Sequence, residues 1–426
     1  MTVQAPFSPP DPRDAGVPLR VTPLLALLGH VCVWLFVFSG FFVIREPSPY
    51  ELLGVPVIGA AFLFGLTFPK PVIPVVALLS LYLISGFIGM TLASDPAAAR
   101  FHVAVTAFLV GTSIFFACYC AREPIARIGA ISTALQCGAL LSALAGVAGY
   151  LNVAGTAETF TLFGRAKGTF QDPNVFGPFL VIAFVFAVYQ VLSKPMRSWG
   201  FPMLVVGVCL AGILLSFSRA SWGYLLLATA LVAGLHYALT PHLAERIRIL
   251  FLASLGMTGA VVGLLIALSV PDIRDQFLHR ANLLNSYDAG ELGRFGIQAI
   301  GFQMSLDHPF GLGTFRFREL LGLDPHNVYL NALMAHGWLG FFAYTTLILL
   351  TVQHLLKVIL FHPPLRVVAV PVFSLFVGMA FMGLVIDTDR WRHFYLLLGL
   401  SWGMIAHSIT RPYRDDRHAN ERQPTF

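Results

Sequence analysis

The chain has 426 residues, of which 57% are hydrophobic and only 11% are charged, and its mean hydropathy is +0.77. This composition lies far outside the range of soluble globular proteins and leaves no room for a sizeable soluble domain. The formal net charge is +6. The positions of the basic residues between the apolar segments indicate how the chain is oriented in the membrane and where an anionic partner could bind.

Apolar segments of about 17 to 25 residues, the length that crosses a bilayer as a helix, recur along the whole chain. The sequence therefore predicts an all-α integral membrane protein with about twelve transmembrane helices and a large loop before the tenth. The predicted spans are residues 20–44, 51–68, 72–92, 101–120, 125–150, 174–193, 200–217, 220–238, 248–270, 327–356, 366–386 and 391–409.

The predicted organisation is one transmembrane domain over residues 19–410 with a short tail on each side. Residues 1–18 are polar and rich in proline and are predicted to be a disordered tail, and residues 411–426 form the second tail. Lys and Arg collect in loops on the cytoplasmic side, and their distribution puts both tails there. The two longest connections, residues 151–173 and 271–325, then lie on the outer side, which favours an enzyme that works at that face.

Basic residues also gather on the predicted outer side, where this rule expects few. They are Arg165, Lys167, Arg219, Arg274, Arg280, Arg294, Arg316, Arg318, Arg390 and Arg392. They can pair with acidic residues of the same loops or with lipid phosphates, or they can bind an anionic ligand. Arg219 favours a ligand, because a cation at the start of a helix opposes the helix dipole and no carboxylate is near it in sequence.

Two predicted helices begin with an aspartate followed by a proline. Asp172 and Pro173 open the sixth span, and Asp324 and Pro325 open the tenth. Aspartate is a good N-cap and proline a good first helical residue, so both helices are expected to begin there, on the outer side. Asn174 is the next residue of the sixth helix.

His326 and Asn327 then fall in the first turn of the tenth helix, with Tyr329 and Asn331 behind them. The positive end of the helix dipole keeps an imidazole uncharged, able to accept a proton, and attracts a phosphate. These polar groups can instead bond to neighbouring helices, with His326 serving only as a cap. Two helix N-termini directed at one outer cavity favour an active site.

The segment ELGRFGIQAIGFQMSLDHP, which contains Arg294, is predicted to form an amphipathic helix in the large loop. Its apolar positions recur at steps of three and four and are Leu292, Phe295, Ala299, Phe302 and Leu306. The helix is expected to lie along the outer membrane surface or to cap the bundle, with Arg294 near the level of the lipid headgroups.

Five segments together resemble the O-antigen ligase and polymerase superfamily of bacteria. They are RAKGTFQDPNVFG at 165–177, SFSRASWG at 216–223, GRFGIQAIGFQMSLDHPFGLG at 293–313, PHNVYLNALMAHGWLG at 325–340 and DTDRWRHFYLLLGL at 387–400. The resemblance covers roughly residues 160–405, while the earlier spans match only in number and hydrophobicity.

The resemblance implies an inner-membrane glycosyltransferase with a fold similar to the lipid-phosphosugar-dependent (GT-C-like) enzymes. Such an enzyme transfers a glycan from undecaprenyl pyrophosphate, on the periplasmic side, to a hydroxyl of lipid A core or of another glycan chain. It implies no metal or other cofactor. The catalytic histidine of the family matches His326, and its two functional arginines match Arg219 and Arg294.

These residues suit that chemistry. Arginines and helix N-termini stabilise the leaving diphosphate, and His326 is the candidate base that takes the proton of the attacking hydroxyl, with inversion at the anomeric carbon. The remaining candidates, for substrate binding, are Arg165, Lys167, Asp172, Asn174, Asn327, Tyr329, Asn331, Arg390 and Arg392. Asp387 and Asp389 could form a metal-binding D-x-D pair, but the arginines that follow favour carboxylates that orient those arginines.

Two alternatives remain open at this point. A polysaccharide polymerase would use the same donor with a second lipid-linked glycan as acceptor. A transporter or flippase of lipid-linked glycans would also place polar groups near a cavity, although its charges usually lie near the middle of the membrane rather than at one surface.

Overall fold

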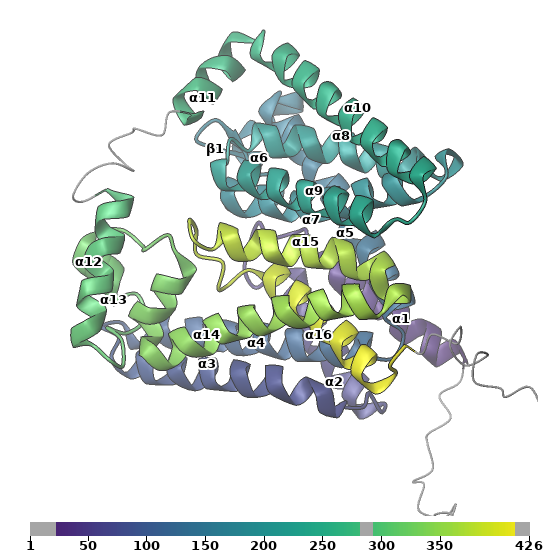
Figure 1. The fold of residues 1–426 in the computed structure, drawn as a ribbon. Coiled ribbons are helices and arrows are strands. Elements are labelled where there is room, and N and C mark those ends of the chain that lie inside the picture. The colour runs from purple at the N-terminus through teal and green to yellow at the C-terminus, as the bar shows by residue number, and fades with distance from the viewer. Residues whose placement is uncertain (1–22, 282–292, 414–426) are drawn as a thin grey trace, which may run out of the picture.

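The computed structural model describes residues 23–281 and 293–413, which form a bundle of helices (Figure 1). The predicted first tail and residues 414–426 of the second lie outside the described residues. Apart from one small hairpin, the described elements are helical, in agreement with the predicted all-α class.

Within the described residues, one helix of 15 residues or more overlaps each predicted span. They are α1 (Pro23–Ser39), α2 (Pro49–Leu63), α3 (Ile73–Thr91), α4 (Pro96–Cys120), α5 (Pro124–Tyr150), α7 (Pro173–Ser193), α8 (Gly200–Leu215), α9 (Arg219–Leu239), α10 (Leu243–Leu268), α14 (Val328–Phe361), α15 (Arg366–Met382) and α16 (Arg392–Thr410). Prolines stand in the first turn of several of them, where their missing N–H has no intrahelical partner to lose.

Eight of the described helices are long and apolar enough to cross a membrane, so this part of the chain is that of a multi-pass membrane protein. They are α3 with the turn before it, α4, α5, α7, α9, α10, α14, and α15 with the turn before it. The helices α1, α2 and α8 are equally apolar but shorter, and α16 falls short of these criteria in hydropathy.

The least apolar of the long helices lies at the centre of the molecule. α16 packs against α4, α14 and α15, and residues 393–406 are all buried. Its polar side chains find protein partners, since Trp402 Nε1 donates to Thr351 Oγ1 of α14 at 2.9 Å. A helix enclosed by other helices needs no lipid-facing surface, which explains the lower hydropathy of α16.

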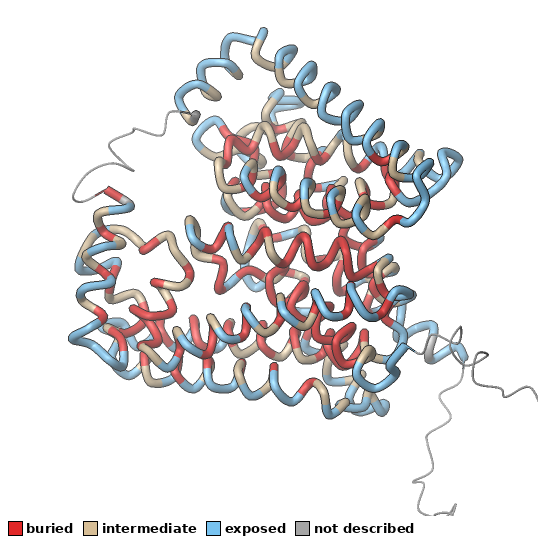
Figure 2. The backbone as a smooth tube through the Cα atoms, viewed as in Figure 1, coloured by how far each residue is buried: buried red, intermediate tan, exposed pale blue. Residues whose placement is uncertain are grey.

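The opposite extreme is α10, which lies along the outside of the bundle and is drawn almost entirely in the colour of exposed residues (Figure 2). Only 6% of its most apolar stretch is buried by protein. Its exposed side chains include Phe251, Leu255 and Leu265, as expected for a helix covered by lipid.

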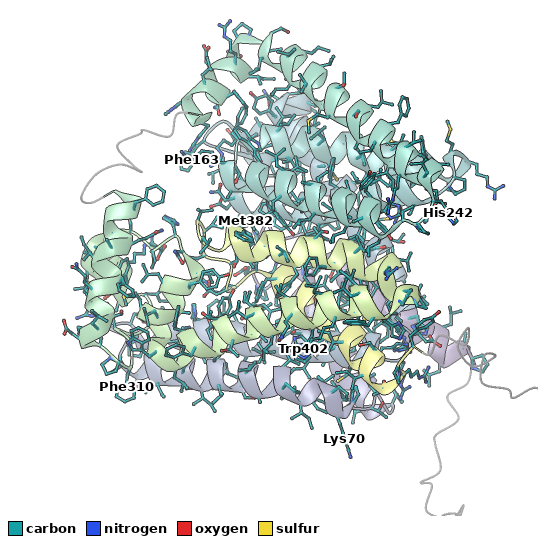
Figure 3. The ribbon with its side chains drawn as sticks, viewed as in Figure 1. Lys70, Phe163, His242, Phe310, Met382 and Trp402 are labelled. Atoms are coloured by element: carbon teal, nitrogen blue, oxygen red, sulfur yellow. The ribbon has the colours of Figure 1, made fainter. Side chains whose placement is uncertain are left out.

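The short elements belong to the two long connections that the sequence predicts to lie outside. They are α6 (Ala157–Phe160), β1 (Thr161–Leu162), β2 (Arg165–Ala166), α11 (Pro271–Ala281), α12 (Arg294–Asp307) and α13 (Arg316–Leu321). Figure 3 shows Phe163 and Phe310, one from each connection, at one end of the bundle, while Lys70 and His242 lie at the other end. Loops that are more than 100 residues apart in sequence therefore share one end.

The predicted amphipathic helix of the large loop is present as α12, and it packs against α14. The predicted apolar positions Phe295, Phe302 and Leu306 point away from the bundle, being 58%, 52% and 62% exposed. Ile297, which is 1% exposed, makes the contact with the bundle instead. Leu292, at the predicted start of this face, lies outside the described residues.

Helix α14 is broken at Gly337, which has φ +67° and ψ −170°. Trp338 N donates to Pro309 O at 3.1 Å, and Met334 O accepts from Leu312 N at 2.7 Å. The loop before α13 thus supplies the hydrogen bonds that the helix loses at its break. This fixes the loop against the outer third of α14.

Candidate active site

A cavity of about 640 Å³, here called the first chamber, lies where the two long connections meet the bundle. It brings together residues from segments far apart in sequence, seven of which are predicted site residues. These are Arg165, Asp172, Asn174, Arg219, His326, Asn331 and Arg390.

The hairpin formed by β1 and β2 carries Arg165 into the wall of the first chamber. Arg165 is only 7% exposed, and its guanidinium donates from Nε to Ser216 O at 2.8 Å and from Nη2 to Asn174 Oδ1 at 2.9 Å. Burial and the nearby Arg280 lower the pKa of Arg165 to about 10, and Asp172 acts in the opposite direction. Arg165 therefore remains a cation at neutral pH and ties the start of α7 to the end of α8, just before the turn into α9.

Arg219 is the first residue of α9 and lines the first chamber. The turn before it is tight, because Phe217 has φ +46° and Ser218 caps the helix by accepting from Ser221 N. The start of α7 packs directly on this turn, since a Cβ added to Gly177 would lie 2.3 Å from Ser221 Oγ. Two helix N-termini, those of α7 and α9, thus meet at the chamber.

The predicted start of the tenth helix is wrong by about one turn. α14 begins at Val328, and its N-cap is Asn327 instead of the predicted Asp324. Asn327 Oδ1 accepts from Tyr329 N and Leu330 N. His326 precedes the helix and has a left-handed backbone conformation with φ +49°. His326 therefore does not lie in the first turn of the helix, where the helix dipole was predicted to keep its ring uncharged.

What holds His326 is a carboxylate from the loop between α15 and α16. Asp387 accepts from the backbone N–H of His326 and of Asn327, each at 3.1 Å. Its Oδ2 also lies 4.0 Å from His326 Nδ1. On the other side, Gln298 of α12 donates from its amide nitrogen to Pro325 O at 3.0 Å. The imidazole therefore stands beside an acid that can stabilise its protonated form.

The acidic loop serves a different purpose from the one predicted. Asp387 binds the backbone at His326, and Asp389 Oδ2 accepts from Asn331 Nδ2 at 3.3 Å, instead of orienting the arginines that follow. Burial, followed by the neighbouring Asp389 and Asp324, raises the pKa of Asp387 to about 7, and the two backbone N–H bonds lower it. This carboxyl group therefore titrates close to neutral pH.

Four predicted binding residues do not line the first chamber. Asn327 is used as the helix cap, and Tyr329 donates its hydroxyl proton to Ala380 O of α15 at 2.9 Å. Lys167 directly follows β2 of the hairpin, and its backbone N–H donates to Phe160 O. Arg392 forms ion pairs with Glu51 at 2.6 Å and with Glu46 at 3.3 Å.

Arg294 begins α12, but its side chain lies outside the described part of the chain, so its predicted role stays a prediction. Several residues of the first chamber escaped the sequence analysis. Arg280 and Arg318 belonged to the outer basic group, and their place near the site could have been suspected from that. His102 is a lone histidine within an apolar span and carried no signal at all.

Comparison with known proteins identifies one family. A family model described as O-antigen ligase matches residues 203–345, a segment that begins in α8, ends in α14 and includes Arg219, Arg294 and His326. No curated protein matches the chain. The match confirms the resemblance to the O-antigen ligase and polymerase superfamily. Residues 203–345 are therefore similar to the O-antigen ligase family, and this similarity implies a glycosyltransferase-like enzyme activity.

Proposed function

We propose that the protein is a glycosyltransferase of the bacterial inner membrane that works on the periplasmic face. It moves a glycan from undecaprenyl pyrophosphate to a hydroxyl group of an acceptor, with lipid A core as the acceptor of an O-antigen ligase. The observation that carries this proposal is that one cavity is lined by His326 together with Arg165, Arg219 and Arg280.

The arginines suit a diphosphate leaving group. They come from β2, α9 and α11, and the N-termini of α7 and α9 add the positive ends of two helix dipoles at the same place. Negative charge grows on the diphosphate as the glycosidic bond breaks, and fixed cations in a partly enclosed cavity stabilise it. We propose Arg219 as the principal contact, with Arg165 and Arg280 beside it and no metal required.

His326 is proposed as the general base. The acceptor oxygen attacks the anomeric carbon, the bond from that carbon to the diphosphate oxygen breaks, and the diphosphate leaves with the electron pair. The proton of the acceptor hydroxyl passes to His326, and Asp387, 4.0 Å from Nδ1, stabilises the imidazolium that forms. A base of this kind contributes roughly 10² to 10⁴ in rate. Displacement in one step inverts the anomeric centre.

The arrangement of the bundle supports the proposed side of the membrane. The first chamber is lined by residues of both long connections, among them Phe163. Figure 3 shows Phe163 at one end of the bundle and Lys70 at the opposite end. Short basic loops face the cytoplasm in membrane proteins, which supports a periplasmic chamber and our proposal that all twelve long helices cross or partly cross the bilayer.

Reconstituted protein tests this proposal, with undecaprenyl-pyrophosphate glycan as donor and either lipid A core or a second glycan-lipid as acceptor, so that ligase and polymerase are distinguished. We expect Arg219→Ala to weaken binding of undecaprenyl pyrophosphate and His326→Asn to abolish transfer. Asparagine tolerates the left-handed backbone that residue 326 adopts, so this variant keeps the fold. We expect transfer to persist in the presence of a chelator.

Two variants serve as matched controls. Arg122 donates to Gly65 O and does not line the first chamber, and His354 lies on α14 with its ring bonded to Leu350 O. Arg122→Ala and His354→Asn should therefore transfer at the normal rate. Full turnover by His326→Asn would rule out the base, and unchanged diphosphate binding by Arg219→Ala would rule out the proposed clamp.

A further inference from the structure

A second cavity of about 560 Å³, here called the second chamber, adjoins the first. The two chambers share His102 of α4, Asp172 and Val175 at the start of α7, and Asp387, Asp389, Arg390 and Trp391 of the loop before α16. We call this shared boundary the neck. The site is therefore not a single hollow but two chambers that meet beside Asp387, the residue that holds His326.

The second chamber differs from the first in its lining. It is formed largely by apolar and aromatic side chains between α1, α2, α4 and α7, among them Phe108 and Phe179. Val55 of α2 and Phe101 of α4, which also line it, are 65% and 63% exposed, so the chamber reaches the outer surface of the bundle. A molecule with apolar surface can therefore reach the neck from the side of α2 and α4.

His102 lies at the neck without a partner. Its side chain is 5% exposed, and neither ring nitrogen has a hydrogen-bond partner among the residues that the structure describes. The ring makes only aromatic contacts, at 5.2 Å from Phe315 and 6.4 Å from His336 between centroids. A buried polar group without a partner costs about 1 to 3 kcal/mol, and such a group beside two cavities is suited to bind a ligand.

Charge divides the site into two parts. Arg165, Arg219 and Arg280 line the first chamber but not the second, whereas the neck holds the carboxylates of Asp172, Asp387 and Asp389 together with one arginine, Arg390. A diphosphate is stabilised at the arginines and repelled by the carboxylates. Carboxylates and an imidazole instead suit hydroxyl groups, which can both donate and accept, and the ring of Trp391 offers a flat apolar surface to a sugar.

Displacement in line requires the attacking hydroxyl and the leaving diphosphate on opposite sides of the anomeric carbon. With the diphosphate at the arginines, the hydroxyl must come from another direction, and the neck joins the first chamber to a second space from which it can come. A hydroxyl bound there is next to Asp387 and therefore close to His326, the proposed base.

Resting on the proposed function, we infer that the neck is the acceptor subsite, that a hydroxyl-bearing glycan acceptor reaches it from the second chamber, and that His102 positions the attacking sugar by a hydrogen bond. His102 is a positioning residue, because the proton of the attacking hydroxyl goes to His326. The apolar lining of the second chamber contacts apolar surface of the acceptor, while the donor keeps to the first chamber.

The test separates acceptor from donor in the reconstituted transfer assay. We expect His102→Ala to raise the KM for the acceptor about tenfold or more, the worth of one buried hydrogen bond, with the KM for the donor and the Kd for undecaprenyl pyrophosphate unchanged. His102→Gln, which keeps a donor and an acceptor group, should recover part of the loss. Val105→Trp, which fills the second chamber from α4, should raise the acceptor KM in the same way.

His354→Ala is the matched control and should change neither constant. If His102→Ala and Val105→Trp leave the acceptor KM unchanged, or weaken binding of undecaprenyl pyrophosphate instead, the inference is wrong and the second chamber holds no acceptor. The proposed function fails by a different result, namely that Arg219→Ala and His326→Asn leave donor binding and transfer intact. Only variants with the melting temperature of the unmodified chain are compared. If His102→Ala is less stable, His102→Gln is used in its place.

Discussion

The contact between Asp387 and residue 326 organises the site at the level of single residues. One carboxylate holds two backbone amides and lies 4.0 Å from the imidazole, so it fixes both the backbone and the electrostatics of the proposed base. His326 has φ +49°, a conformation that costs a non-glycine residue about 1 kcal/mol or more unless its surroundings hold it. Two hydrogen bonds to an acid supply that support.

The raised pKa of Asp387 predicts a pH dependence of transfer. The pKa moves from the usual 3.8 to about 7 in the folded protein. Because the ionised carboxylate is the form that stabilises an imidazolium, the rate should rise as pH increases through about 7. Stability should change in the opposite sense: the fold favours the protonated form, so the contribution is full below 3.8 and is lost as pH rises through about 7.

Rate and melting temperature measured between pH 5 and 9 check this, with Asp387→Asn for comparison. In that variant both dependences should flatten near neutral pH, and the rate should be lower than that of the unmodified chain above about pH 7, where Asp387 is ionised. A pH profile that Asp387→Asn leaves unchanged would assign the transition to another group.

At the level of elements, the sequence predicted the helices better than their ends. The run Asp324, Pro325, His326, Asn327 predicted the start of the tenth helix to within a turn, because capping residues act locally. The true cap lies at Asn327 because Asp387, 60 residues further on, takes the amide of Asn327. A contact of that separation leaves no trace in local propensity, and neither does the break at Gly337.

The break in α14 predicts a strong effect of one added methyl group. A Cβ on Gly337 would lie 2.5 Å from Phe310 C and 2.6 Å from Pro309 O, and φ is +67°. We expect Gly337→Ala to lower stability by about 2 kcal/mol or more and to reduce transfer, because the displaced loop leads into Phe315 of the first chamber. Thermal unfolding and the transfer assay measure the two effects.

Gly256→Ala on α10 is the matched control. Nothing lies within 4 Å of the Cβ that it would add, and alanine is a better helix former, so stability should hold or increase. Equal melting temperatures for the two variants would contradict the role assigned to the break.

For the whole molecule, composition and hydropathy predicted the class, and basic residues predicted that the two long connections share one end. The clustering of Arg165, Arg219 and His326 in one chamber also followed from the sequence, through the outer basic residues and two capped helices. The sequence did not predict which helices are buried in the bundle and which lie at its surface. α16 is central and α10 peripheral although both read as apolar spans, because packing depends on surfaces that periodicity does not identify. His102 stayed hidden for the same reason.

The proposed orientation predicts which end of the bundle is accessible from outside the cell membrane. A cysteine at residue 163 should react with a membrane-impermeant maleimide in spheroplasts, and a cysteine at residue 70 should react only after permeabilisation, since Phe163 and Lys70 lie at opposite ends (Figure 3). Phe163 is 84% exposed, which makes the site reactive. The unmodified chain, with its 5 cysteines, gives the background. Labelling in the reverse order would invert the topology.

The central place of α16 has a consequence for biogenesis. Among the described helices α16 is the last to be synthesised, yet α4, α14 and α15 pack around it. These three helices therefore cannot complete their packing until α16 has been synthesised. Because α16 is the least apolar of the long helices, it is more stable in contact with these helices than in contact with lipid. Asp389 and Trp391 are fixed only when it docks, so a nascent chain becomes competent only after α16 has been translated.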